Sequence, residues 1–436
     1  MNRRDAMHCV STVTNTTNFN SSTMKFILFL LFIFFVPALF SQEIIEFRGV
    51  GRTGHFNETG LLKQWPEAGP EMVLKIEGIG KGYSHPVLVE DVIFVTGIKK
   101  DTTDVLSAYN LKGEQLWETV YGRSWTKSYT DSRSTPTFEN GKIYVSSGTG
   151  QVNCIDTKTG KIIWQVDVIK LYNGEIYVHG DAENPLLVND LVVFTTGGTE
   201  NTMVALSKSD GTLVWKTKSL GGAKSYASPV LIQHNETPVI LAQTSENLVA
   251  IHPGNGEIYW HYNLIRFHLH EQGVGANANP PLYFNGEIFV TSGYNHPGIK
   301  LALSPDGKSV TEVWKNDTID THHGGVVLTD GNIYGANWQN NTKGRWASVN
   351  WKTGKTNWET EWYNKGSTVF ADGMLYIYEE KSGNIALVEP SPEKMKIVST
   401  FKITDGDGPH WAHPAIYNGK LFIRHGNALM VYDIKK

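Results

Sequence analysis

An internal repeat constrains the fold of this chain more than any other feature. Six segments share one order: a short β-like run, a polar hairpin turn, a second and a third run, and a glycine turn before a fourth run that carries tryptophan. A unit of roughly fifty residues cannot bury its hydrophobic face alone, so neighbouring units must stack on one another. The six segments are residues 84–120, 134–166, 184–218, 228–263, 279–316 and 324–361.

Tryptophan stands at a nearly fixed distance after the glycine turn. Five segments have the spacing Gly-x-x-x-Trp, and a sixth has three extra residues. A large ring at one place in each four-stranded sheet is expected to fill the wedge between neighbouring sheets. A row of tryptophans that stacks on a ligand or glycan is the alternative, but these residues recur in step with the turn rather than with loop chemistry. The pairs are Gly113–Trp117, Gly160–Trp164, Gly211–Trp215, Gly256–Trp260, Gly307–Trp314 and Gly354–Trp358.

Two further units depart from this pattern. The seventh, residues 366–403, has Val398 in the place of tryptophan, and the eighth, residues 413–434, lacks a strand. Residues 71–76 read as the missing fourth strand, with Leu74 in the tryptophan place. An N-terminal strand that completes the last sheet closes a ring and removes open sheet edges. The sequence therefore predicts an all-β, eight-bladed β-propeller of four-stranded antiparallel blades, the last blade closed by an N-terminal strand.

The N-terminal residues are expected to direct export. A strongly apolar run at residues 26–36 follows a lysine and precedes Pro-Ala-Leu-Phe and the small residue Ser41, which is the order of a secretory signal peptide. The run is too short to span a bilayer, although an N-terminal membrane anchor is the alternative. We predict a polar leader or a misassigned start at residues 1–23, a signal peptide at 24–41 and one propeller domain at 43–436. The mature protein would be periplasmic or secreted, without a membrane span.

Cysteine content and charge narrow the function. Cys9 precedes the predicted signal, so the mature chain keeps only Cys154, which is expected to be a small buried hydrophobe rather than a nucleophile. The net charge is −4, and Lys and Arg are scattered, so no basic footprint for nucleic acid is present. No phosphate loop, zinc-protease helix, nucleophile elbow or dinucleotide fingerprint occurs in a supporting context. Hydrolase and nucleotide-binding functions therefore have little support.

The residues just before the first strand of each unit form the candidate site. In a propeller this strand lies beside the central channel, so these residues converge on one rim. Their mixture of imidazole, guanidinium, amide and aromatic groups predicts a concave site for a small polar ligand. The alternative is that they cap strand starts and bind water in a solvated channel. The candidate ligand-binding residues are Tyr83, His85, Arg133, Glu183, Asn184, Ser228, Asn279, His322, His323, Lys365, Trp411 and His413.

Histidines gather at the same positions and raise the question of a metal site. Opposite blades place such residues far across the channel, so no metal site is predicted from them. The His-His-Gly-Gly phrase at residues 322–325 is the most suggestive, since glycine permits close backbone approach and imidazole serves as acid or base. His268 and His270, near Glu271 in the long loop 266–279, lack a clear third ligand. The histidines at blade starts are His85, His322, His323, His410 and His413.

The repeat resembles the pyrroloquinoline-quinone (PQQ) repeat family of exported bacterial propellers. The resemblance rests on Asp-Thr-Lys-Thr-Gly-Lys at residues 156–161 ahead of Trp164, and on Thr-Pro-Thr at 135–137. Residues 47–49 and 59–66 also resemble the N-terminal lead of PQQ-binding-like propellers, so the likeness runs from there to the C-terminus. It implies an eight-bladed propeller with one of two functions. Quinoprotein dehydrogenases hold the quinone with a metal ion, an acidic base and a disulfide between adjacent cysteines, whereas scaffold members, such as an outer-membrane assembly lipoprotein, bind proteins and no cofactor.

The chain departs from both of these patterns. It has no adjacent cysteine pair, no calcium-ligand triplet that can be matched, and no lipobox cysteine. We expect a periplasmic PQQ-binding-like protein that binds a small polar ligand, such as a quinone or a sugar alcohol, as an accessory to alcohol or carbohydrate oxidation or to polysaccharide degradation. PQQ with calcium is the cofactor if one is bound, and turnover as a quinoprotein oxidoreductase stays open. The alternative is a non-catalytic scaffold that docks a protein or glycan partner.

Overall fold

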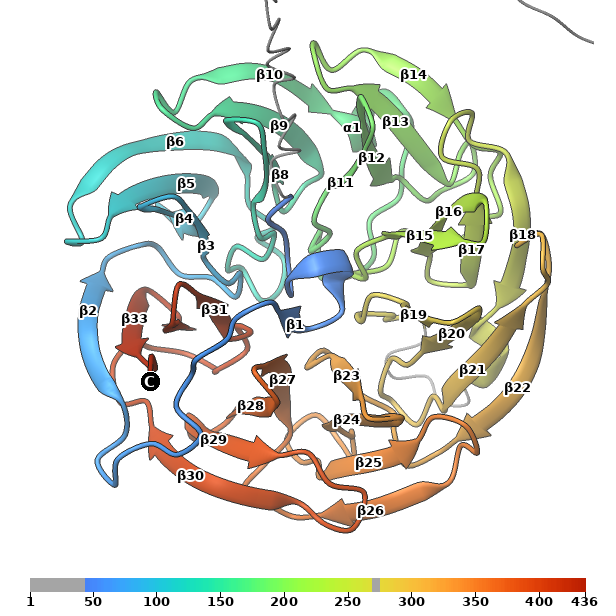
Figure 1. Cartoon of the computed structure of the whole chain (residues 1–436). Helices are drawn as coiled ribbons and strands as arrows, with labels where there is room; N and C mark the ends of the chain where they lie inside the picture. Colours follow the sequence, from blue (N-terminus) through green and yellow to red (C-terminus); the bar gives the residue numbers. More distant parts are fainter. Residues whose placement is uncertain (1–43, 269–274) are drawn as a thin grey trace, which may run out of the picture. The chain divides into compact units, whose positions relative to one another are not determined.

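The computed structural model describes residues 44–268 and 275–436. These residues form eight sheets arranged as a ring of blades, each blade with four antiparallel strands (Figure 1). The sheet of the seventh blade has a fifth strand, which pairs in parallel and comes from the N-terminal part of the chain. The eight-bladed β-propeller predicted from the repeat is therefore confirmed. Helical segments are short, namely η1 (Val50–Arg52), α1 (Val168–Leu171) and η2 (Ile265–Phe267). In this part of the chain no helix has the length and apolar character needed to cross a membrane.

The first four blades take their strands in chain order, from the centre of the ring outward (Figure 1). Their strands are β3 (Val87–Val89), β4 (Val92–Lys99), β5 (Thr103–Asn110) and β6 (Gln115–Arg123); β7 (Thr137–Glu139), β8 (Lys142–Ser146), β9 (Gln151–Asp156) and β10 (Ile162–Asp167); β11 (Leu186–Val188), β12 (Leu191–Thr195), β13 (Met203–Ser207) and β14 (Leu213–Lys216); and β15 (Val230–His234), β16 (Thr237–Gln243), β17 (Asn247–Ile251) and β18 (Ile258–Asn263).

The remaining blades follow the same order, except that the last takes its outer strand from the N-terminal part of the chain. Their strands are β19 (Leu282–Phe284), β20 (Glu287–Val290), β21 (Gly298–Leu303) and β22 (Val310–Asn316); β23 (Val326–Thr329), β24 (Asn332–Ala336), β25 (Trp346–Asn350) and β26 (Thr356–Thr360); β27 (Gly366–Ala371), β28 (Met374–Glu379), β29 (Asn384–Glu389) and β30 (Lys396–Lys402); and β31 (Ala415–Tyr417), β32 (Lys420–His425) and β33 (Ala428–Asp433) with β2 (Glu71–Glu77).

Burial explains why these sequences form blades. The second and third strands pack against neighbouring blades on both faces, so they are nearly continuous apolar runs, as in β4, which is buried from Ile93 to Ile98. The outer strands keep one face in solvent, and every residue of β6 except the buried Tyr121 is accordingly exposed or half-buried. Each blade thus contributes two apolar faces to the core, and its outer strand forms the circumference.

The repeated tryptophans lie in the seams between blades. The indole Nε1 of Trp117 donates to the carbonyl oxygen of Thr157 in the next blade at 2.9 Å, and Trp164 donates in the same way to Lys208 at 3.0 Å. The ring of Trp117 also covers Gly160, where an added Cβ would lie only 2.7 Å from the ring. The predicted packing role of these tryptophans is therefore confirmed.

The strand predicted to close the ring is also present. β2 pairs antiparallel with β33, with Leu74 opposite Val431 and Ile76 opposite Leu429. Leu74 reaches the turn of the first blade, where its Cδ1 would lie 3.1 Å from a Cβ at Gly113. Leu74 therefore takes the place in the seam that tryptophan takes elsewhere.

An N-terminal arm, residues 44–56, lies at the centre of the ring, where the sequence predicted no element (Figure 1). Its strand β1 (His55–Phe56) pairs in parallel with β27 of the seventh blade. At its other end, the backbone of Ile45 exchanges two hydrogen bonds with Phe138 of the second blade, at 3.2 and 2.8 Å. The arm therefore joins opposite sides of the ring across its centre.

Some predictions fall on residues outside the described ranges. The leader at 1–23, the signal peptide at 24–41 and the residues His270 and Glu271 lie there, so these remain predictions. Cys154 is described: its thiol is buried and free, and burial raises its pKa to about 11. This agrees with a small buried hydrophobe rather than a nucleophile.

Candidate functional site

A cavity of about 270 Å³ lies at the end of the ring from which the chain enters the innermost strands. We call it the aromatic cavity. Eight of the twelve candidate residues line it, namely Tyr83, Arg133, Asn184, Ser228, His322, His323, Trp411 and His413. The other lining residues are Phe47, Tyr129, His179, Ala182, Tyr226, Ala278, Tyr294, Asn341 and Glu380.

Aromatic rings form one continuous wall of this cavity. Trp411 lies at its middle, with ring centroids 4.9 Å from Tyr83, 5.5 Å from Tyr129 and 5.4 Å from His323. All three neighbours are tilted or edge-on to the indole, which are favourable arrangements for aromatic pairs. The wall therefore offers ring faces and edges to a ligand.

Neutral imidazoles and phenols complete the lining. Burial lowers the pKa of His179 and, more strongly, that of His322, so both rings are neutral at pH 7. The Nδ1 atom of His322 is buried and has no hydrogen-bond partner among the described residues. Burial also raises the pKa of Tyr294 to about 12, so its phenol keeps its proton. These groups can donate and accept hydrogen bonds without carrying charge.

The floor of the cavity is Phe47 of the N-terminal arm. Its ring stacks on His85 at 5.4 Å and meets His413 edge-on at 5.1 Å. Both imidazoles also accept hydrogen bonds from Arg48: the backbone N donates to His85 Nε2 at 2.9 Å, and Nη1 lies 2.8 Å from His413 Nδ1. Burial lowers the pKa of His85 to about 4 and that of His413 well below its usual value. These histidines therefore hold the chain's own arm, and His85 does not line the cavity.

One carboxylate, Glu380, lines the cavity, and it is paired on both sides. Its Oε1 lies 2.5 Å from the Nζ of Lys365, and its Oε2 lies 3.3 Å from the Nε2 of His323. Burial alone would raise the pKa of Glu380, but His323 and Lys365 hold it below its usual value. Lys365 does not line the cavity itself but forms an ion pair with Glu380, which does. With Nε2 directed at this carboxylate, Nδ1 of His323 is left to accept a hydrogen bond.

Arg133 is the only guanidinium among the lining residues, and it too is engaged. It donates to the backbone carbonyl oxygens of Ser128, Tyr129 and His179. Burial lowers its pKa. These contacts show a side chain that holds the loops of residues 128–129 and 179 in place.

Glu183 and Asn279 lie behind the lining. Glu183 and Asp181 flank the Nζ of Lys224 at 3.3 and 2.5 Å, with all three side chains fully buried. Burial raises the pKa of Glu183 to about 7, although Lys224 opposes this shift. The Nδ2 of Asn279 donates to three backbone carbonyl oxygens at 2.7 to 3.0 Å, among them that of His322. Both candidates therefore support the wall and do not face the cavity.

Several lining residues were not among the candidates. Tyr294, Asn341 and Glu380 follow second strands, and Tyr129 and His179 lie in connections between blades. A signal was available for the first three, because the end of the second strand of an antiparallel pair lies beside the start of the first. The connections between blades are not paired in a regular register, so the sequence did not predict which of their residues line the cavity.

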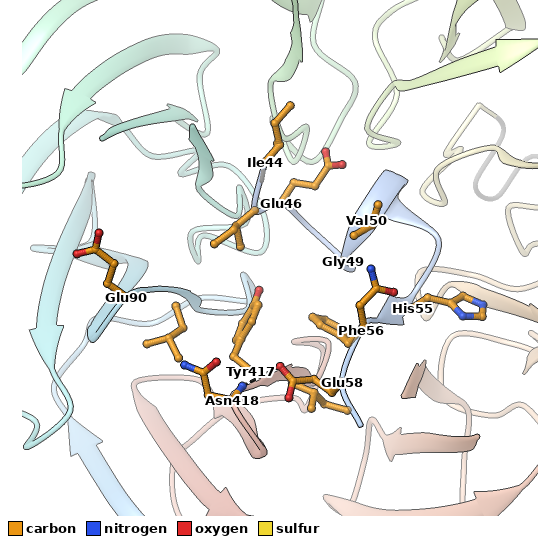
Figure 2. Close-up of a pocket in the computed structure, with 14 residues that line it drawn as sticks. Ile44, Glu46, Gly49, Val50, His55, Phe56, Glu58, Glu90, Tyr417 and Asn418 are labelled. Atoms are coloured by element: carbon orange, nitrogen blue, oxygen red, sulfur yellow. Dashed lines mark hydrogen bonds between the residues drawn. The ribbon is translucent and has the colours of Figure 1, made fainter. Parts of the chain in front are cut away.

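A second cavity, of about 320 Å³, lies between the N-terminal arm and the turns of the first and eighth blades (Figure 2). We call it the acidic cavity, since three glutamates line it. None of the twelve candidates is among its described lining residues, which are Ile44, Ile45, Glu46, Gly49, Val50, His55, Phe56, Asn57, Glu58, Leu88, Glu90, Ile416, Tyr417 and Asn418.

Metal binding finds no support in either cavity. No group of three or more His, Cys, Asp or Glu side chains within residues 44–268 and 275–436 is arranged to hold a metal ion. His268 lies close to His296, with ring centroids 4.6 Å apart, whereas His270 and Glu271 of the same loop lie outside the described ranges.

Comparison with known proteins identifies two groups of relatives. A family model for outer membrane protein assembly factor BamB matches residues 101–360. BamB of Yersinia pestis is 22% identical over 321 residues, which cover 71% of this chain and 75% of that protein. BamB from Moraxella catarrhalis has a TM-score of 0.58 at 13% identity, covering 84% of this chain and 99% of that chain. Quinohemoprotein alcohol dehydrogenase from Comamonas testosteroni has a TM-score of 0.61 at 12% identity, covering 88% and 79%. At these identities the two structures show a shared fold.

Proposed function

Because this chain belongs to the PQQ-like repeat propeller family of outer membrane protein assembly factor BamB, we propose that it is an exported binding propeller whose aromatic cavity takes a small, uncharged, polyhydroxyl ligand. The observation that carries this proposal is the combination of an aromatic wall with neutral hydrogen-bonding groups. The wall is centred on Trp411, and the neutral groups include His322 and Tyr294.

The charge of the cavity favours an uncharged ligand. Arg133 and Glu380 are the only Arg, Lys, Asp or Glu side chains among the described residues that line it, and each is engaged with protein groups. A ring ligand such as a sugar or a cyclic sugar alcohol can place its apolar face on Trp411 while its hydroxyls bond to the imidazoles. The Nδ1 of His323, opposite the carboxylate of Glu380, is an acceptor for one such hydroxyl.

PQQ with calcium, the cofactor that the resemblance implies, does not fit these residues. The quinone bears several carboxylates, and Arg133, the only Arg or Lys in the described lining, already donates to three backbone carbonyl oxygens. Calcium takes six to eight oxygen ligands, as a rule with several carboxylates, and no group of acidic side chains among the described residues is arranged to hold an ion. We therefore derive no redox step for this cavity.

Titration calorimetry on the purified protein tests the proposal. The panel holds neutral monosaccharides, disaccharides and sugar alcohols, with PQQ measured in the presence and absence of calcium. We expect a neutral polyol to bind, and the Trp411→Ala variant to lose at least about tenfold in affinity because it removes the central ring of the wall. Tyr363→Ala is the matched control, since Tyr363 is an exposed aromatic residue outside the cavity. Binding of PQQ alone, or equal polyol binding by Trp411→Ala, would contradict the proposal.

A second candidate function is docking of a protein partner on the circumference, and the family name favours it. The outer strand β6 exposes Leu116 and Val120, which are 52% and 58% accessible, and β14 exposes Val214 at 53%. If the circumference binds a purified outer-membrane assembly protein, a Leu116→Glu/Val120→Glu variant will lose that binding while Trp411→Ala retains it. The opposite pattern would assign the partner to the cavity end of the ring.

Export is part of the proposal and has its own test. N-terminal sequencing of the protein recovered from the periplasm is expected to show cleavage near Ser41. Recovery of the uncleaved chain from the membrane fraction would favour the anchor instead.

A further inference from the structure

The acidic cavity has no part in the function proposed above. Apolar side chains line it, among them Ile45, Leu88 and Ile416, and Tyr417 extends into it from β31 (Figure 2). Its volume of about 320 Å³ is sufficient for a small molecule. The lining therefore favours a ligand with an apolar part.

The charge of the lining is negative and is only partly balanced. Glu46 is paired, because its Oε2 accepts from Arg52 Nε at 2.8 Å. Glu58 accepts from two backbone amides of the β31–β32 turn at 2.8 and 3.0 Å, and no Lys, Arg or His of the described residues forms an ion pair with Glu58 or Glu90. Burial lowers the pKa of His55, so this ring adds no compensating charge. The carboxylate of Glu58 thus lines the cavity, and the exposed Glu90 lies at its rim, and no cation of the described residues is paired with either.

The hydroxyl of Tyr417 points to the same kind of ligand. It is buried and has no hydrogen-bond partner among the described residues. Burial, together with the charges of Glu46 and Glu58, raises its pKa, so the phenol stays neutral and can accept a hydrogen bond. A buried polar atom without a partner costs free energy, and a ligand N–H would remove that cost.

A bare metal ion does not fit this cavity. No three acidic or metal-ligating side chains in the described part of the chain are grouped closely enough to hold one. An organic cation spreads its contacts over a larger volume, with N–H donors at one end and carbon at the other. An organic cation therefore suits a cavity whose carboxylates are spread apart and whose remaining lining is apolar.

We propose that the acidic cavity is a second binding site, for a primary alkylammonium ion on a short apolar stem. The ammonium group donates to Glu58 and to the hydroxyl of Tyr417, and Glu90 attracts it electrostatically at the rim. The stem packs against Ile45 and Ile416. This site is separate from the aromatic cavity and does not depend on the ligand proposed for that cavity.

Titration calorimetry with n-butylammonium chloride on the full chain tests the site, and n-butanol serves as the probe of equal shape without charge. We expect n-butylammonium to bind, n-butanol to bind at least about tenfold more weakly, and the affinity for the amine to fall with added salt. The double variant Glu58→Gln/Glu90→Gln is expected to lose at least about tenfold in affinity. Glu67→Gln, which alters an exposed glutamate outside the cavity, is the matched control.

Two further variants keep the result interpretable. The side chain of Glu90 forms no hydrogen bond or ion pair with any residue that the structure describes, so Glu90→Gln alone is expected to fold normally and should still weaken amine binding. Tyr417→Phe removes the unpartnered hydroxyl and should weaken amine binding without lowering the melting temperature. Equal binding of n-butanol, or unchanged affinity in Glu90→Gln and in the double variant, would overturn the proposal. Trp411→Ala should leave amine binding unaffected, so failure here and failure of the polyol site are distinguishable.

Discussion

Arg48 lies at the centre of the ring, fully buried, and no carboxylate of the residues that the structure describes forms an ion pair with it. Its guanidinium instead donates to the carbonyl oxygens of Gly324, Val326 and Thr368 at 3.2, 2.8 and 2.9 Å, and contacts His413 Nδ1 at 2.8 Å. Burial lowers its pKa to about 9, which still leaves the group charged at neutral pH. One arm residue therefore satisfies acceptors from three blades.

Replacing Arg48 should destabilise the ring. In Arg48→Met the apolar stem remains, but several buried acceptors lose their donors, and each such loss costs about 1–3 kcal/mol. We expect the free energy of unfolding in urea to fall by about 3 kcal/mol or more. Arg123→Met, at an exposed position, is the control. An unchanged unfolding midpoint would show that the arm contributes no stability.

Glu380 and Lys365 should behave as a coupled pair. Both are buried, at 6% and 3% accessible, and either single substitution removes one partner of their 2.5 Å ion pair and leaves the other charge buried. We expect Glu380→Gln and Lys365→Met each to cost about 3–5 kcal/mol in the free energy of unfolding, and the double variant to cost less than their sum. A double-mutant cycle by urea denaturation measures this coupling. Additive losses would show that the two charges do not interact.

Which cavity residues the sequence could predict depends on strand register. Tyr83 and Trp411 were found because they precede innermost strands, a position that the repeat marks clearly. His85 was found by the same rule but faces the arm, because a rim position does not fix the direction of a side chain. Glu380 was missed because it follows a second strand.

At the scale of elements, the seams between blades set the stability of the ring. Gly160 and Gly141 both lie in turns of the second blade, with φ of 69° and 73°. A Cβ at Gly160 would lie 2.7 Å from the ring of Trp117, whereas at Gly141 the nearest atom is 4.0 Å away. Comparing alanine at these two positions therefore separates the cost of a strained backbone from the cost of disturbed packing between blades.

Gly160→Ala should destabilise the protein more than Gly141→Ala does. Both substitutions place alanine at positive φ, which costs about 1–2 kcal/mol. Only Gly160→Ala also forces the indole of Trp117 to move, which should add about 1–3 kcal/mol. Thermal unfolding of the two variants measures the difference. Equal losses would show that the indole can shift without cost.

The sequence predicted the elements that repeat and missed those that do not. β2 was recognisable because Leu74 keeps the spacing of a fourth strand and the last blade lacked one. The arm was not, because β1 has only two residues and its partners lie in blades far along the chain. A segment whose contacts are all distant carries no periodic signal of its own.

The whole molecule should lose stability as the pH falls from about 6.5 to about 5. Five buried histidines have lowered pKa values in the folded state, so between about pH 6.5 and pH 5 the unfolded chain binds more protons than the folded one. The contribution of these histidines to the free energy of unfolding is therefore fully present above about pH 6.5 and is lost as the pH falls. Three carboxyls act in the opposite direction, since burial raises their pKa values, and their contribution is present in acid and lost as the pH rises. The histidines are His85, His296, His322, His410 and His413, and the carboxyls are Asp104, Glu183 and Asp320.

Because the histidines outnumber these carboxyls, the net slope should be at least about 1.4 kcal/mol per pH unit, the value for one proton. Urea denaturation at several pH values across this range measures it. A free energy of unfolding that is constant or rises toward pH 5 would contradict the burial of the histidines.

The arm also sets the order in which the molecule can be assembled. It precedes the blades in the chain, so a ribosome makes it before any of the surfaces that receive it. Those surfaces include β27 and the carbonyl oxygens around Arg48, which follow about three hundred residues later. The first part of the propeller to be synthesised is thus among the last to reach its final position, and until it does so the centre of the ring stays open.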